Sequence, residues 1–220
     1  MGGAAGQGDR PLNLDFVENI RTDLDSRFSA RESAIVGSRE VIRASANAIR
    51  ALHREEWGEA NRLIEEAGAG YARMVTVLEG HPDLTHAGFV ADAAKEYTEA
   101  RLTLAFFTGA QLPGPVDLGV DPVPYLHGLG ETVGEMRRRM LDLLRGEHLE
   151  MAEALLEEMD EVVDLLATID YPDGMTNGLR RTTDIARSLV ERSRSDLTVT
   201  MVQERLRNEL RASGEANPPR

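Results

Sequence analysis

The hydrophobic positions along the chain follow the period of an α-helix over most of its length. Phe16, Ile20 and Leu24 show the pattern near the start, where apolar residues at intervals of four share one side of a helix. No stretch shows sustained alternation of apolar and polar residues, so we expect no β-sheet. The pattern predicts seven helices, at about 14–28, 29–54, 55–79, 88–108, 123–145, 149–169 and 175–212.

Local signals mark where several of these helices begin and end. Ser29 and Glu32 have the spacing of a capping box, which predicts that a second helix starts here. The Gly-His-Pro sequence at 80–82 breaks the chain after the third helix. The stretch 109–122, rich in Pro and Gly, is the one substantial loop.

Helices joined mostly by short loops predict an all-α bundle. The helical region, 11–212, is long enough to enclose a core and is predicted to form a single domain. The ends of the chain, 1–10 and 213–220, are predicted to be disordered tails. Gly68 and Gly70 weaken the third helix, and they indicate either a bend or a close contact with a neighbouring helix.

The second predicted helix carries an apolar stripe, which should face the core, and a basic ridge beside it. The arginines of the ridge fall within about 60° of arc. Such a ridge suits phosphate groups, and it equally suits a solvated face that forms ion pairs with acidic helices. The apolar stripe consists of Ile35, Ile42, Ala46 and Ile49, and the basic ridge consists of Arg39, Arg43, Arg50 and Arg54.

Two later helices carry groups of carboxylates. Asp92, Glu96 and Glu99 lie within about 60° of one another on the fourth helix. Glu131 and Glu135 lie one turn apart on the fifth. We expect two antiparallel helices that present these side chains to form an oxygen-rich cage for Mg²⁺ or Mn²⁺. A carboxylate face that serves only solvation has the same pattern.

The charge balance bears on the partners of the protein. The net charge of −13 argues against a generally basic surface for nucleic acid, although it is compatible with a local basic patch. Lys95 is the only lysine, and the other cationic residues are arginines, whose planar groups bind phosphate through two hydrogen bonds. Genome composition and adaptation to high salt produce the same bias.

Composition also excludes several classes of site. The absence of cysteine excludes disulfides, thiolate metal sites and cysteine nucleophiles, and it suits a cytoplasmic protein. The chain has no run of about 18 apolar residues, so we expect no membrane span. Its first ten residues lack the apolar segment of a signal peptide.

Other metal and catalytic chemistries find little support. A di-iron carboxylate bundle requires Glu-x-x-His on two helices, and none of the five histidines has a glutamate three positions before it. His127 precedes Glu131 by one turn and is a candidate ligand, although a hydrogen-bonded structural histidine is the more common situation. No motif supports Ser/His/Asp catalysis.

Three blocks of sequence, in this order and spacing, resemble the translin superfamily and within it the branch of translin-associated factor X. The resemblance covers about residues 12–200. The first block is Ser-Arg-Glu-Val-Ile-Arg at 38–43 with Ile-Arg-Ala-Leu-His-Arg at 49–54. The second is Glu-Tyr-Thr-Glu-Ala at 96–100 with 125–138, and the third is Asp-Tyr-Pro at 170–172 with Gly-Leu-Arg-Arg-Thr-Thr-Asp-Ile-Ala-Arg at 178–187.

The resemblance implies a seven-helix fold that assembles into a hollow oligomer, an octamer, around nucleic acid. The factor X branch is a Mg²⁺-dependent endoribonuclease for single-stranded RNA. Translin itself binds RNA and DNA and lacks the complete acidic site. The resemblance therefore leaves two functions open: a nuclease, or a non-catalytic oligomer that binds single-stranded RNA or DNA. Hetero-assembly with a translin-like subunit is a further expectation.

The same resemblance implies which residues form the site. The catalytic and metal-binding acidic residues of the family match Glu96, Glu99, Glu131 and Glu135 here. Glu131 departs from the pattern, because the family often has the shorter aspartate at this position. RNA binding is expected from the basic ridge and from Arg180, Arg181 and Arg187.

Overall fold

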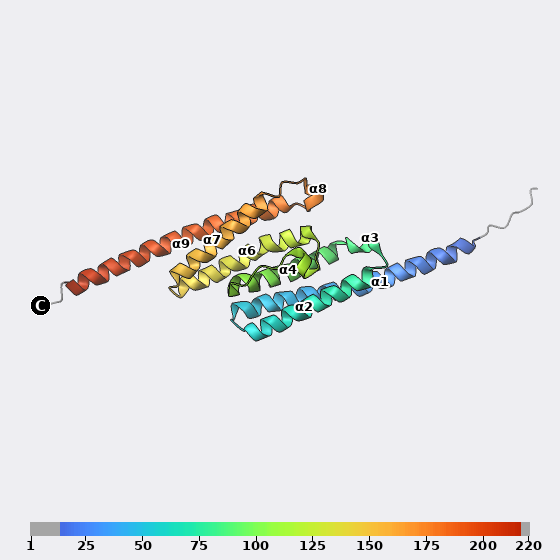
Figure 1. Cartoon of the computed structure of the whole chain (residues 1–220), viewed down its shortest axis with the longest axis horizontal. Coiled ribbons are helices and arrows are strands. Elements are labelled where there is room, and N and C mark those ends of the chain that lie inside the picture. The colour runs from blue at the N-terminus through green and yellow to red at the C-terminus, as the bar shows by residue number, and fades with distance from the viewer. Residues whose placement is uncertain (1–13, 217–220) are drawn as a thin grey trace, which may run out of the picture.

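The computed structural model describes residues 14–216, and the regular structure in this range is entirely helical. The predicted all-α class is therefore confirmed for these residues (Figure 1). Six helices are long and three have a single turn. The long helices are α1 (Asp15–His53), α2 (Trp57–Leu78), α4 (Gly88–Thr108), α6 (Pro122–Arg145), α7 (Leu149–Ala167) and α9 (Leu179–Ala216); the short ones are α3 (Pro82–Thr85), α5 (Pro115–Leu118) and α8 (Asp173–Thr176).

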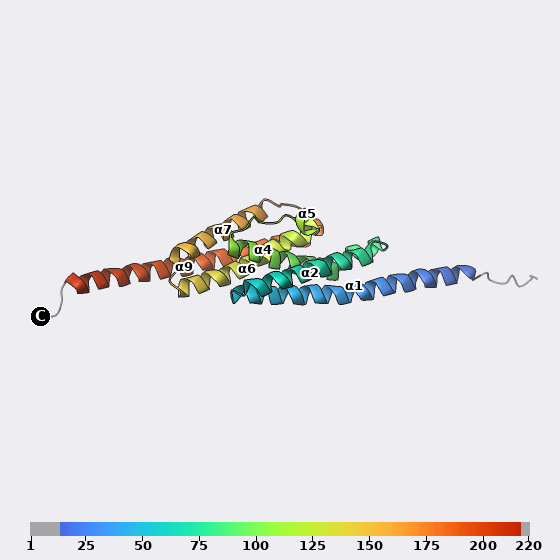
Figure 2. The ribbon, with the colours of Figure 1, turned by 60° about the horizontal axis from the view of Figure 1, so that its bottom comes forward.

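The long helices form three neighbouring pairs. Helix α1 packs on α2, α4 packs on α6, and α7 packs on α9. The pair α4–α6 lies between the other two, because α4 also contacts α1, and α6 also contacts α7 and α9 (Figures 1 and 2). The helices that carry the predicted acidic residues are thus the central pair.

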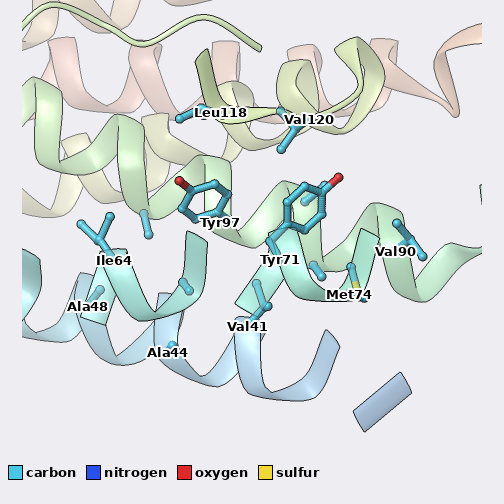
Figure 3. Packing of buried hydrophobic residues seen from close by; sticks show 14 of the residues in the cluster. Val41, Ala44, Ala48, Ile64, Tyr71, Met74, Val90, Tyr97, Leu118 and Val120 are labelled. Atoms are coloured by element: carbon cyan, nitrogen blue, oxygen red, sulfur yellow. The ribbon is translucent and has the colours of Figure 1, made fainter. Parts of the chain in front are cut away.

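Two hydrophobic clusters hold the central pair from both sides. The first joins α1, α2 and α4, and Figure 3 shows it around Tyr71 and Tyr97, whose rings stack with centroids 6.1 Å apart. The second joins α6, α7 and α9 around buried Met136 and Met159. Tyr125 packs against both clusters.

Helices α4 and α6 run parallel, which corrects the expected antiparallel arrangement. Their first turns lie at the same end of the bundle, where His86 Nδ1 is 3.7 Å from Asp121 Oδ2. The loop between the helices explains the difference. Extended, residues 109–121 can span about 40 Å, whereas a helix the length of α4 measures about 30 Å. The loop is therefore long enough to return the chain to the starting end.

The capping box at Ser29 does not start a new helix, because α1 continues through it to His53. No glycine or proline interrupts residues 26–35, so nothing breaks the backbone hydrogen bonds of the helix. Continuity also buries Ala30 and Ala34. The first two predicted helices are therefore one helix of 39 residues.

The core face of α1 lies beside the predicted apolar stripe. Ile49 is buried as expected, but Ile35, Ile42 and Ala46 are only half-buried. The deepest positions are small or β-branched, and they let α1 approach α2 and α4 closely. These positions are Ala34, Val41, Ala44, Ala48 and Ala51.

The last predicted helix is divided near its start. Asn177 and Gly178 have φ angles of 52° and 78°, in the left-handed region that ends a helix. They separate the single turn of α8 from α9, which begins at Leu179. Helix α9 continues to Ala216, into the predicted C-terminal tail; residues 217–220 and the predicted tail 1–10 lie outside the described residues.

Gly68 serves a close helix contact and does not break α2. A Cβ atom at this position would lie 2.7 Å from the hydroxyl oxygen of Tyr97 on α4. Of the two expectations for this glycine, the structure therefore supports close packing.

The first half of α1 and the last half of α9 project from opposite ends of the bundle (Figures 1 and 2). We call residues 14–28 the N-terminal arm and residues 199–212 the C-terminal arm. Large apolar side chains on both arms are exposed. The exposed fraction runs from 50% (Ile20) to 65% (Phe28) on the N-terminal arm and from 41% (Met201) to 64% (Leu210) on the C-terminal arm. None of the described helices is long and apolar enough to cross a membrane.

Candidate metal and nucleic-acid site

A close contact between α4 and α6 sets the geometry of the acidic site. A Cβ atom on Gly128 of α6 would lie 2.7 Å from the carbonyl oxygen of Lys95 and 2.8 Å from Cβ of Thr98, both on α4. Only glycine fits such an approach between backbones. The contact places residues 95–99 of α4 level with residues 128–131 of α6.

Three of the four predicted glutamates meet at this level. Glu96, Glu99 and Glu131 each offer a carboxylate oxygen, and these oxygens all lie within 4.8 Å of one another. We call these three residues the carboxylate cluster. Asp92, one turn earlier on α4, is exposed and is not part of the cluster. The site thus combines residues 32 to 35 positions apart in sequence through the parallel pairing of two helices.

Burial makes the cluster electrostatically costly. Glu99 is 9% exposed, and its burial, followed by the negative charges of Glu96, Glu131 and Glu135, raises its pKa from 4.5 to about 8. Burial also raises the pKa of Glu96. Carboxyl groups in such surroundings favour a bound proton or a bound cation over the free charged form.

Lys95, on α4, already lies among these carboxylates. Lys95 Nζ is 2.9 Å from Oε2 and 3.0 Å from Oε1 of Glu131, and 3.5 Å from Oε1 of Glu96. The interaction was not predicted. Its one signal in the sequence is that this residue is the only lysine of the chain, a feature that composition alone does not assign to a site.

Glu135 has a partner of its own outside the cluster. Its Oε2 atom lies 2.5 Å from Nε2 of His53, at the end of α1, and 4.0 Å from Nη1 of Arg138. The side chain of His53 is only 3% exposed and packs edge-on against Phe107, with ring centroids 5.2 Å apart. The histidine therefore fixes Glu135 beside the cluster, and its negative charge acts on Glu99.

His127 is a structural residue, which confirms the more common of its two expected situations. Its Nε2 atom lies 2.9 Å from the carbonyl oxygen of Thr176, and its Nδ1 atom lies 2.9 Å from the hydroxyl of Thr182. With both ring nitrogens engaged, the side chain ties α6 to α8 and α9 and has no nitrogen left for a metal.

Two hollows adjoin the cluster. The larger, which we call the groove, has a volume of about 740 Å³ and contains Lys95 and Glu131 in its wall. Its other walls come from the first turns of α4 and α6 and from α8, with Tyr71 of α2. The smaller, of about 270 Å³, lies against α9 and exposes Glu99 and Glu131. Both hollows give a ligand access to the carboxylates.

The predicted RNA-binding arginines are all exposed but differ in their partners. Arg39 and Arg43 form no ion pair with any described residue, and Arg43 lines a hollow between α1 and α2 together with Arg73. The partnered arginines are Arg50 with Asn47, Arg54 with Glu56, Arg180 with Asp170, and Arg187 with Asp184.

Comparison with known proteins supports the resemblance of the whole fold. No protein-family model matches the chain. An uncharacterized protein of Methanocaldococcus jannaschii is 25% identical over 200 residues, which are 90% of this chain and 88% of that protein.

Solved structures resemble the chain over nearly their full lengths. The crystal structure of AfC3PO has a TM-score of 0.79 and 29% identity, and the match covers 85% of this chain and 97% of that one. The structure of AfC3PO in complex with duplex RNA, with the same identity and coverage, has a TM-score of 0.69. The crystal structure of apo-NeC3PO, 22% identical over 88% of this chain and 100% of that one, supports the fold with a TM-score of 0.74.

Proposed function

The chain belongs to the translin superfamily with the C3PO proteins, and on this premise we propose that it is a metal-dependent endoribonuclease of the factor X-like branch. The observation that carries the proposal is the carboxylate cluster, in which oxygens of Glu96, Glu99 and Glu131 lie within 4.8 Å of one another. Its position between two accessible hollows supports a reaction on a bound ligand.

The donor set fits Mg²⁺ or Mn²⁺. Both ions prefer carboxylate oxygens and water, and both are commonly held by a few carboxylates beside a substrate phosphate. The raised pKa of Glu99, which burial and then the neighbouring carboxylates cause, also fits, because a divalent cation would compensate both the lost solvation and the repulsion in the charged form. Glu131 reaches the cluster despite being longer than the aspartate that is frequent in the family.

The proposed reaction is hydrolysis of a phosphodiester bond. A divalent cation in the site would supply the Lewis acidity that activates water and stabilises charge on the phosphate. Glu96 and Glu131 would hold the cation, and Glu99 would complete the ligand set once its carboxyl has lost the proton. Glu135, held by His53, would orient the attacking water or accept its proton.

The proposed substrate is RNA, in single-stranded form, with single-stranded DNA as a second ligand. The structure of AfC3PO has been solved in complex with duplex RNA, so each binding test should compare a duplex with the single strand. The free guanidinium groups of Arg39 and Arg43 provide phosphate contacts despite the net charge of −13. The groove has the size of a ligand pocket and offers a place for the nucleotide next to the cleaved bond.

We also propose that the protein acts as an oligomer. The apolar faces of the two arms are exposed in the single chain, and association with further copies would remove them from water. An octamer that encloses the RNA, hetero-assembly with a translin-like subunit, and a cytoplasmic location are the remaining parts of this proposal.

One observation favours a second function. The ammonium group of Lys95 already neutralises part of the cluster, as a permanent counterion would. In that case the protein is a non-catalytic oligomer that binds RNA without cleaving it.

Cleavage of an end-labelled single-stranded RNA separates the two functions. We expect products with Mn²⁺ or Mg²⁺ and none with EDTA, and we expect Glu96→Gln with Glu99→Gln to lower the rate by at least about 100-fold, while RNA binding persists. The control is Glu153→Gln with Glu157→Gln on α7, two exposed positions that remove the same charge away from the site. Binding without metal-dependent cleavage in the wild type would establish the non-catalytic function.

A further inference from the structure

Among the described residues, Lys95 is the one cation that forms ion pairs with the carboxylate cluster. The sequence has 25 lysine and arginine residues, of which only residue 95 is lysine. Every other ion pair that the described residues form uses arginine or histidine. Most of these pairs lie at the surface, whereas the side chains of Lys95 and its partners are among the less exposed, with 24% for Lys95, 26% for Glu96 and 38% for Glu131.

The ammonium group occupies the oxygens that a metal would need. Nζ is almost equidistant from the two oxygens of Glu131, at 2.9 and 3.0 Å, and it also faces Glu96 at 3.5 Å. An ammonium and a divalent cation repel each other strongly at such separations. The two cations therefore compete for these carboxylate oxygens.

Because the cation is a lysine and not an arginine, it can leave the carboxylates and return to them. Arginine holds a carboxylate through a rigid planar fork, whereas lysine is a compact charge on a flexible stem of four carbons. Lys95 also lines the groove, whose walls include the carboxylates of Asp92 and Asp121. Asp92 lies three positions earlier on α4, a spacing at which helical side chains meet. A displaced ammonium group thus has both space and an acidic partner.

We propose that Lys95 is a displaceable internal cation. It neutralises Glu131 and Glu96 while the site holds no metal, and it moves into the groove when a divalent cation binds. The inference rests on the proposed metal site and adds a consequence for it: metal affinity is lowered by the lysine, and the empty cluster is kept stable by it. In the loaded protein the ammonium group lines the groove where the substrate phosphates pass.

Calorimetric titration with MnCl₂ and thermal unfolding test the exchange of cations on the full-length chain. The variant is Lys95→Met, which keeps the length of the side chain and removes its charge. We expect its affinity for Mn²⁺ to rise by about tenfold, equal to about 1.4 kcal/mol, because the metal no longer displaces a charge. In EDTA we expect its Tm to fall, and the gain in Tm on adding Mn²⁺ to exceed that of the wild type.

The matched control is Arg137→Met on α6. Arg137 forms an ion pair of 2.8 Å with Asp196, and its side chain, at 20% exposure, is as buried as that of Lys95, but it lies outside the cluster. Its loss should lower the Tm with and without Mn²⁺ by the same amount and leave the affinity for Mn²⁺ unchanged. Lys95→Arg supplies a second test that does not depend on the folding of the methionine variant. The fixed fork of arginine should hold the carboxylates more firmly and weaken Mn²⁺ binding.

The outcomes separate the inference from the proposed function. Tighter Mn²⁺ binding by Lys95→Met, or weaker binding by Lys95→Arg where the first variant does not fold, supports the exchange. If the wild type binds Mn²⁺ and the variants bind it with unchanged affinity or with the opposite changes, the exchange is overturned and the metal site remains. If neither the wild type nor the variants bind Mn²⁺ or Mg²⁺, Lys95 is a permanent counterion, and both the exchange and the metal-dependent nuclease are overturned.

Discussion

At the scale of single residues, the protonation of Glu99 is linked to folding and to metal binding. Burial raises its pKa from 4.5 to about 8 in the folded chain. Between these two pH values the unfolded chain has lost a proton that the folded chain keeps. The contribution of Glu99 to stability is therefore fully present below about pH 4.5 and is lost as the pH rises towards 8.

We expect the metal-free wild type to lose stability across this window relative to Glu99→Gln, by at most about 1.4 kcal/mol per pH unit. Urea unfolding in EDTA at pH 5, 6, 7 and 8 measures the difference. Glu153→Gln, exposed on α7, should follow the wild type. Parallel pH profiles for the wild type and Glu99→Gln would show that the carboxyl is ionised in the folded chain. In the wild type, metal affinity should rise with pH up to about 8, because binding releases the proton.

The arginines of α1 differ in whether their charge is free. Arg43 has no acidic partner among the described residues, whereas Arg54 gives two hydrogen bonds to Glu56, of 2.9 and 2.6 Å. We expect Arg43→Gln to weaken RNA binding and to reduce the salt slope by about 0.7–1, and Arg54→Gln to do so less. Fluorescence anisotropy at several salt concentrations measures both. The reverse order of effects would mean that the basic ridge binds RNA through other positions.

At the scale of helices, the contact at Gly128 decides where the glutamates meet. A Cβ atom there would lie 2.7 Å from a backbone carbonyl oxygen of α4, and a backbone cannot move aside as a flexible side chain can. We expect Gly128→Ala to destabilise the fold by about 1–3 kcal/mol and to weaken Mn²⁺ binding, because α6 must move away from α4. Urea unfolding and calorimetry measure the two effects.

Gly134→Ala is the control on the same helix. Its Cβ atom would meet only Leu189 Cδ1, at an ordinary 3.9 Å, and alanine favours a helix over glycine by up to about 1 kcal/mol. This variant should be as stable as the wild type or more stable, with unchanged metal affinity. Equal losses in the two variants would attribute the effect to helix α6 in general and not to its contact with α4.

The helices themselves could be predicted because their signals are local. Periodic apolar residues and the Gly-His-Pro break depend on neighbours a few positions away, and they located most of the helical residues. The errors arose where a local signal had to compete with its surroundings. The capping box at Ser29 did not start a new helix, because no nearby glycine or proline interrupts α1. Conversely, the left-handed residues Asn177 and Gly178 end α8 although the apolar pattern continues across them.

The candidate site was less accessible from sequence, because it depends on contacts between distant segments. Glu96 and Glu99 were found through their spacing within one helix. The 13-residue loop 109–121 is long enough for α6 to run in either direction relative to α4, so its length does not predict which direction the helix takes. The pair of His53 and Glu135 joins positions 82 apart, and no spacing rule indicates it.

At the scale of the whole molecule, the two arms carry many of the exposed large apolar side chains. We expect Leu206→Glu with Leu210→Glu on the C-terminal arm to shift the protein towards smaller species, because each charge would be buried in a contact between chains. Light scattering after size-exclusion chromatography measures the change. Val116→Glu on α5 is the control, since Val116 is 91% exposed and lies away from both arms. A wild type that is monomeric at micromolar concentration would remove the enclosed-chamber part of the proposal.

The single lysine allows selective chemical labelling of one side chain. Amine-directed reagents can react with only one side chain in the whole sequence, and this side chain lines the groove beside the carboxylate cluster. A fluorophore or an isotopically labelled methyl group attached there would report on that spot alone, apart from any label on the α-amino group. Bifunctional amine cross-linkers, in contrast, have no second lysine to reach within a subunit, so the size of the assembly is better measured by mass than by cross-linking.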